Sequence, residues 1–214
     1  LISKKIIKKL LKLSIGHNSD IISAIIKNSG VIIILGIFYD SYIVGYVATI
    51  KTLFYFMPIR FFGKLSHIFL YEYANLFIKK KFNLIRQSFI NVTKIILGLL
   101  IFFLIISFFL GPFIYNLWIN NKYQIDIFLL IIIIFDVFFY TLRDSIITVL
   151  RSINKYMLLG VSELMITSTS VLFFYLALYF GYSFQYGFLV ILIGSLISLM
   201  YGSTILFNFF KKLK

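Results

Sequence analysis

The sequence predicts an all-α integral membrane protein whose chain forms a bundle of six transmembrane helices. Three observations lead to this class. Of the 214 residues, 61% are hydrophobic and 13% are charged, whereas about a quarter of the residues of a soluble domain are charged. The mean hydropathy is +1.02. The charged residues gather between long apolar stretches, as they do in multi-pass membrane proteins.

Six apolar stretches are long enough to cross a bilayer, because about 20 helical residues span the hydrocarbon. We expect a single domain over residues 1–214, with spans at residues 19–39, 46–77, 92–110, 123–151, 157–180 and 188–209. Lysines alternate with Ile and Leu before the first span, which predicts a basic amphipathic helix on the membrane surface. These lysines are Lys4, Lys5, Lys8, Lys9 and Lys12.

The residues within and between the spans fit this division. Pro58 should kink the second span, because proline removes a helical hydrogen bond. Gly111 and Pro112 should end the third span. A basic turn at residues 152–156 should join the fourth span to the fifth, and an uncharged turn at residues 181–187 should join the fifth to the sixth.

The basic residues are distributed unequally between the two sides of the predicted bundle. Five precede the first span, four lie at residues 78–86, two at residues 151–156 and three at the end of the chain, whereas the turns on the other side hold only Lys122. Lys and Arg accumulate on the cytoplasmic side of membrane proteins. We therefore predict that both termini are cytoplasmic.

Several functional classes are disfavoured. The net charge of +14 follows from the asymmetry just described, and no nucleic-acid-binding motif accompanies it, so we expect no nucleic acid partner. The chain has no Cys and only two His, so we expect no disulfide and no metal site. No nucleophile motif, phosphate loop or large extramembrane loop indicates an enzyme. We expect a transporter with no cofactor, other than a coupling cation such as sodium or a proton.

Charged side chains inside the predicted spans are the first candidates for function, because they are costly in hydrocarbon. The first span carries a polar stripe that includes Asp20 and Lys27, and the fourth carries Asp136, Arg143 and Asp144. We assign to a substrate pathway Lys27, Asn28, Lys51, Arg60, Asp136 and Arg143. We assign to ion or proton coupling Asp20 and Asp144.

The basic candidates outnumber the acidic ones, which favours an anionic substrate such as a pyrophosphate or phosphosugar. Asp136 and Arg143 are seven residues apart and share a helix face. The alternative is that these charges pair with neighbouring helices only to hold the bundle together. We interpret Glu163 as a cap at the start of the fifth span and the hydroxyls of residues 167–170 as packing contacts.

Three segments, in order along the chain, resemble a known family. Residues 34–77, ILGIFYDSYIVGYVATIKTLFYFMPIRFFGKLSHIFLYEYANLF, resemble its helix–LGPxxVGxY–helix entry. Residues 110–118, LGPFIYNLW, precede the fourth span and the turn RSINKY, and residues 179–198, YFGYSFQYGFLVILIGSLIS, resemble the start of a late helix. The chain is similar to the C-terminal half of the Wzx-like O-antigen and polysaccharide flippases, within the MATE-like exporter superfamily.

The resemblance implies a fold and a function. Such proteins have twelve to fourteen spans in two bundles around a central cavity, so this chain would be the C-terminal lobe of a longer protein. The activity would be translocation of an undecaprenyl-diphosphate-linked oligosaccharide across the bacterial cytoplasmic (inner) membrane by alternating access, for O-antigen or capsular polysaccharide biosynthesis. Membrane lipids and polysaccharide assembly proteins would be its partners.

Three alternatives stay open. Half of a MATE-type multidrug exporter would share the fold, although acidic residues are expected to hold cationic drugs. A membrane polysaccharide polymerase would need a large outer loop with catalytic Arg or His. An inactive, truncated remnant is the third alternative, because a single bundle does not enclose a two-bundle cavity.

Overall fold

Every regular element of the chain is a helix in the computed structural model, which describes residues 4–211 and the side chains of residue 11 and residues 14–211. The elements are α1 (Lys4–Ile25), η1 (Ile26–Gly30), α2 (Val31–Phe38), α3 (Ser41–Lys51), η2 (Thr52–Phe56), α4 (Met57–Ile68), α5 (Leu70–Ile78), α6 (Phe82–Phe109), α7 (Gly111–Ile119), α8 (Ile127–Ser152), α9 (Met157–Tyr179) and α10 (Phe184–Lys211). The predicted helix at the N-terminus is present, but the side chains of Lys4, Lys5, Lys8, Lys9 and Lys12 lie outside the described part.

Five continuous helical segments are long and apolar enough to cross a membrane. They are Ser14–Phe38, Ser41–Ile78, Phe82–Phe109, Met157–Tyr179 and Phe184–Lys211. The chain is therefore an all-helical, multi-pass membrane protein in its described part. The predicted count of six is not confirmed, because every 18-residue stretch of α8 contains Asp136, Arg143 and Asp144, more charge than such a segment normally tolerates.

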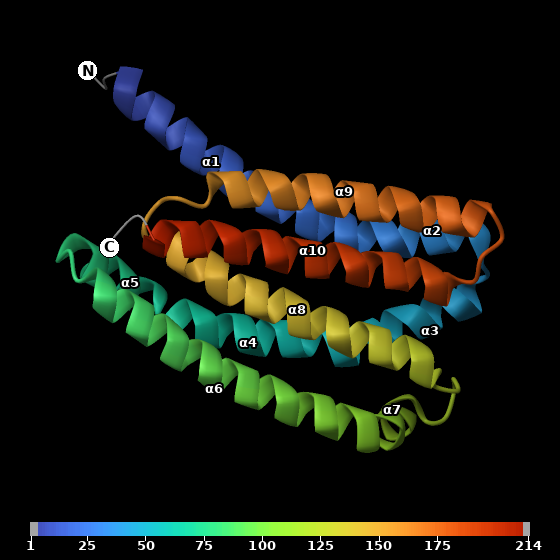
Figure 1. Cartoon of the computed structure of the whole chain (residues 1–214). Coiled ribbons are helices and arrows are strands. Elements are labelled where there is room, and N and C mark those ends of the chain that lie inside the picture. The colour runs from blue at the N-terminus through green and yellow to red at the C-terminus, as the bar shows by residue number, and fades with distance from the viewer. Residues whose placement is uncertain (1–3, 212–214) are drawn as a thin grey trace.

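The helices lie side by side in one bundle (Figure 1). α10 packs against both α8 and α9, α1 packs along α9, and α8 also packs against α4 and α6. One end of the bundle holds the start of α1, the end of α10, the α5–α6 turn and the α8–α9 turn (Figure 1). We call it the basic end of the bundle. The segments in which the sequence concentrates Lys and Arg therefore lie on one side, as the topology prediction requires.

Several helix boundaries differ from those predicted, and local caps explain two of them. The second span was expected to begin at residue 46, but α3 begins at Ser41 because the Asp40 side chain accepts a hydrogen bond from the Ile43 amide, at 3.0 Å. The fourth was expected from residue 123, but α8 begins at Ile127 because Asp126 accepts from the Phe128 amide, at 2.8 Å.

The third helix is longer than predicted. It was expected over residues 92–110 after a loop at residues 78–86, but α6 begins at Phe82. Ile85 is buried in the same apolar cluster as Tyr73 of α5. This buried residue extends the apolar face of the helix by two turns into the basic segment, which leaves only a short turn between α5 and α6.

Two π-helical turns interrupt the first two spans. The distortion expected near Pro58 takes the form of η2, because a proline cannot donate to the carbonyl four residues earlier and the Met57 amide bonds to Thr52 instead. The other turn, η1, contains Lys27. Turns of this kind occur frequently at functional sites, and each of these two lies at a buried lysine, Lys27 or Lys51.

α1 crosses α9 at a contact between two glycines. A β-carbon on Gly160 would lie 2.2 Å from the carbonyl oxygen of Gly16, and one on Gly16 would lie 2.7 Å from the α-carbon of Met157. The two backbones can approach this closely only because both positions lack a side chain. Asp20 lies one helical turn after Gly16 in α1. The glycine crossing therefore fixes the height along the bundle at which Asp20 meets α8.

Candidate functional site

The first group of buried charges lies where η1 faces α8 and α10. The Lys27 ammonium donates to the Asp136 carboxylate and to the Ser195 hydroxyl, each at 2.7 Å, and Ser195 donates to the same carboxylate. Tyr55 and Tyr140 place their rings 5.5 and 5.4 Å from the ammonium. Lys27 is 6% exposed and Asp136 is 6% exposed. Burial of this pair is tolerated because each charge has a close partner.

A second lysine, Lys51, lines the same small cavity as Lys27 and Asp136. It is 4% exposed, and the described residues give it no carboxylate partner. Its ammonium instead lies over the rings of Tyr55 and Phe56, at 5.4 and 5.6 Å from their centroids. Aromatic faces stabilise a cation only partly compared with a carboxylate, so Lys51 is a buried charge that is incompletely compensated.

The second group joins α1, α8 and α9 nearer the basic end. Arg143 donates to one oxygen of Asp20 at 2.9 Å, and Arg151 donates to the other at 2.5 Å. The Nε atom of Arg143 also lies 3.2 Å from a Glu163 oxygen, which accepts a hydrogen bond from Ser198. Arg143 is 2% exposed, and its planar guanidinium can hold two carboxylates at once.

A polar cavity of about 200 Å³ opens beside the second group, and we call it the inner cavity. Asp20 contributes from α1, His67 from α4 and Asp144 from α8, with Gly63 and Arg151 also lining it. Among the described residues, the Asp144 carboxylate has no ion pair. The two carboxylates predicted to couple an ion, Asp20 and Asp144, therefore line the same cavity.

The charges in and around these groups are balanced, in contrast to the excess of base counted from the sequence. The cations are Lys27, Lys51, Arg143 and Arg151, and the carboxylates are Asp20, Asp136, Asp144 and Glu163. Arg60 does not join them, because it is exposed on α4. The anion-attracting interior predicted from the base count is thus not present in this arrangement.

The other predicted site residues are distributed as follows. Asn28 is half-buried beside Lys27 in η1, and its side-chain oxygen has no hydrogen-bond partner among the described residues. Asp136 and Arg143, predicted to share a face, are both buried but belong to different groups. The structure therefore separates a lysine–carboxylate pair in the middle of the bundle from an arginine–carboxylate cluster nearer the basic end.

Three residues of the site were missed or misread from the sequence. Glu163 was interpreted as a helix cap, which is wrong, because its carboxylate contacts Arg143. Arg151, the last residue of the predicted fourth span, was counted only among the basic residues of the cytoplasmic side, and Ser195 was not considered. Glu163 lies two turns inside an apolar helix, where a carboxylate needs a partner, so its position could have indicated a buried ion pair.

No three His, Cys, Asp or Glu side chains gather as metal ligands in the part of the chain that the structure describes. Comparison of the chain with protein-family models, with curated proteins and with solved structures gave no match. The fold and the site therefore define a class only: a multi-pass helical membrane protein with buried ion pairs and a polar cavity between its helices.

Proposed function

We propose that the chain is one six-helix lobe of a bacterial inner-membrane flippase that moves a lipid-diphosphate-linked oligosaccharide by alternating access. The inner cavity carries the proposal. It brings Asp20, His67 and Asp144 from three helices to one polar opening between predominantly apolar helices. Polar cavities of this kind between membrane helices mark transport pathways.

The proposal requires that α8 also crosses the membrane, which brings the number of spans from five to six. Its 26 residues reach about 39 Å at the rise of an α-helix, which exceeds a hydrocarbon core of about 30 Å. Two of its charges, Asp136 and Arg143, are bonded to side chains of neighbouring helices. With the basic end facing the cytoplasm, as the distribution of Lys and Arg predicts, α8 would enter the membrane from the outer side.

The cations available to a diphosphate lie on α4 rather than inside the bundle. Arg60 and Lys64 are exposed, have no ion pair among the described residues, and directly follow Ile59 and Gly63, which line the inner cavity. They are four residues apart and share a helix face. The substrate phosphates would bind these two cations, while Asp144 would take up the coupling ion.

The test is made in the organism that carries the chain, with surface polysaccharide as the readout. Arg60→Gln combined with Lys64→Gln should reduce surface polymer and leave lipid-linked oligosaccharide in the inner leaflet. Lys122→Gln, at the opposite end of the bundle, is the matched control and should have no effect. Normal surface polymer after complete removal of the chain would overturn the proposal. Substitution of Lys27 or Arg143 is uninformative here, because both hold the bundle together.

A cation exporter is the second candidate, because Asp144 offers a carboxylate without an ion pair to the inner cavity. It is distinguished by efflux of a fluorescent organic cation from cells. Efflux that requires the chain and is abolished by Asp144→Asn, with normal surface polysaccharide, would replace the flippase proposal by this one.

A further inference from the structure

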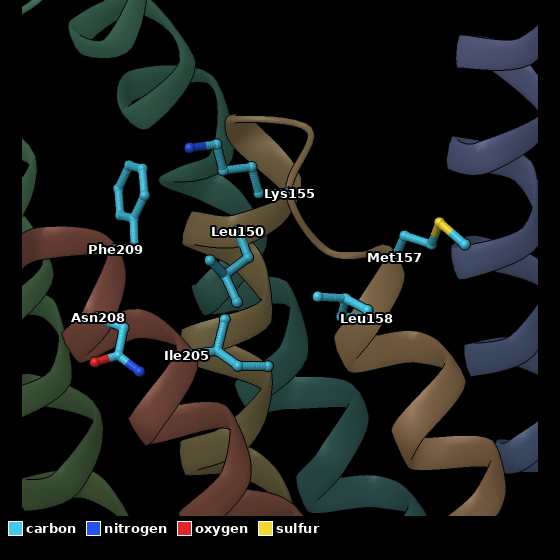
Figure 2. Close-up of a pocket in the computed structure, with 7 residues that line it drawn as sticks. All are labelled: Leu150, Lys155, Met157, Leu158, Ile205, Asn208 and Phe209. Carbon is cyan, nitrogen blue, oxygen red and sulfur yellow. The ribbon is translucent and has the colours of Figure 1, made fainter. Parts of the chain in front are cut away.

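A second cavity, of about 400 Å³, lies at the basic end between α8, α9 and α10 (Figure 2). Leu150 of α8 and Ile205 and Phe209 of α10 line it. Leu158 of α9 and Ile205 point toward one another across it (Figure 2). The volume is within the usual range of ligand sites, about 300–1,000 Å³. We call this cavity the terminal groove.

The chain places one cation at the mouth of the terminal groove by a defined turn. Asn154 has a left-handed backbone, with φ 57°. The amides of Asn154 and Lys155 donate to the carbonyls of Arg151 and Leu150, at 3.0 and 2.8 Å. This pair of bonds is the Schellman arrangement that ends many helices. It brings Lys155 back over the last turn of α8, at the edge of the groove.

The ammonium of Lys155 contacts an aromatic ring rather than a carboxylate. It lies 4.8 Å from the centroid of the Phe209 ring, and the described residues give it no carboxylate partner. Asn208 also lines the groove, and Lys211 follows it by three residues on the same helix face. Among the residues that the structure describes, no Asp or Glu lines the groove. An anion entering here would meet cations, an amide donor and no opposing charge.

We infer that the terminal groove binds one anionic phospholipid, with the phosphate on Lys155 and an acyl chain against Leu158 and Ile205. The surroundings favour a lipid over a soluble anion. Leu158, which lines the groove, is 67% exposed, so the groove has an apolar edge where the bundle would face the bilayer. Basic pockets between transmembrane helices at the cytoplasmic side are suited to acidic lipid headgroups.

The test is native mass spectrometry of the purified full-length protein with equal amounts of phosphatidylglycerol and phosphatidylcholine. The unchanged protein should retain phosphatidylglycerol about fivefold better, the worth of one lysine near an anionic lipid. Lys155→Gln should abolish this preference. Lys122→Gln should keep it, although it also removes a lysine that lies over an aromatic ring, 5.6 Å from the centroid of Tyr123.

A second variant tests the apolar part of the site. Ile205→Trp should fill the groove and reduce retention of the lipid with Lys155 intact, and helix content measured by circular dichroism shows whether the variant is folded. Equal retention of both lipids, an unchanged preference in Lys155→Gln, or full displacement of the lipid by glycerol phosphate would each overturn the inference. None of these outcomes depends on transport activity, so the proposed function stands or falls separately.

Discussion

The ammonium of Lys27 lies 2.7 Å from the carboxylate of Asp136, and a second lysine, Lys51, lines the same cavity without a carboxylate of its own. One carboxylate therefore faces two buried cations. Both lysines lie at π-helical turns, Lys27 within η1 and Lys51 directly before η2. The two lysines consequently differ in what their removal would leave behind.

Lys27→Met should destabilise the protein by about 3 kcal/mol, because it leaves the Asp136 carboxylate buried without its cation. The double variant Lys27→Met with Asp136→Leu should recover most of this loss, since no charge is then stranded. Unfolding by sodium dodecyl sulfate in mixed micelles measures the four free energies of the cycle. Additive losses in the double variant would show that the two groups do not interact.

Lys51→Met should be neutral or stabilising, because it removes a desolvated charge and deprives no carboxylate of a partner. The same unfolding measurement applies, with Lys27→Met as the matched comparison at the other π-helical turn. A loss as large as that of Lys27→Met would mean that Asp136 depends on Lys51 as much as on Lys27.

Arg143→Lys should reduce the free energy of unfolding by about 2 kcal/mol although it keeps the charge, since an ammonium cannot reproduce the planar fork that reaches both Asp20 and Glu163. The variant should also become more sensitive to protease, because α1 and α9 are both held through this side chain. An unchanged free energy of unfolding would indicate that one of the two contacts does not contribute to stability.

Gly160→Ala should destabilise the bundle by about 1–3 kcal/mol through overpacking, because the added carbon would lie 2.2 Å from the Gly16 carbonyl oxygen. Gly98→Ala is the matched control in α6, where a β-carbon meets nothing within 4 Å. This control should be neutral or slightly stabilising, since alanine favours a helix over glycine. Thermal unfolding in detergent compares the two. A similar response of both variants would contradict the glycine crossing.

The helical class and most of the helices could be predicted from hydropathy, because apolar length alone selects a membrane helix. Their boundaries could not. Asp40 caps its helix through one hydrogen bond and Asp126 through two, and such caps are weak signals among many Asp, Asn and Ser residues. The π-helical turn at Lys27 left no mark in the sequence comparable to the proline that follows η2.

The candidate site was predictable in composition but not in pairing. Lys27, Asp136, Arg143 and Asp20 were all selected, since a charge in an apolar helix is conspicuous. Which of them meet depends on how each helix is rotated about its axis and on the depth of the glycine crossing between α1 and α9. Glu163 and Arg151 were overlooked for this reason. They add one charge of each sign, and the base excess disappeared because Arg60 is exposed and lies outside both groups.

The ion pairs of α1 also constrain the order in which the protein can be made. Lys27 is 109 residues from Asp136, and Asp20 is 123 and 131 residues from Arg143 and Arg151. The first helix therefore leaves the ribosome long before its partners in α8 exist. Until then its charges are uncompensated in the bilayer, so the nascent chain must keep α1 at the insertion machinery, or in water, until α8 has been synthesised.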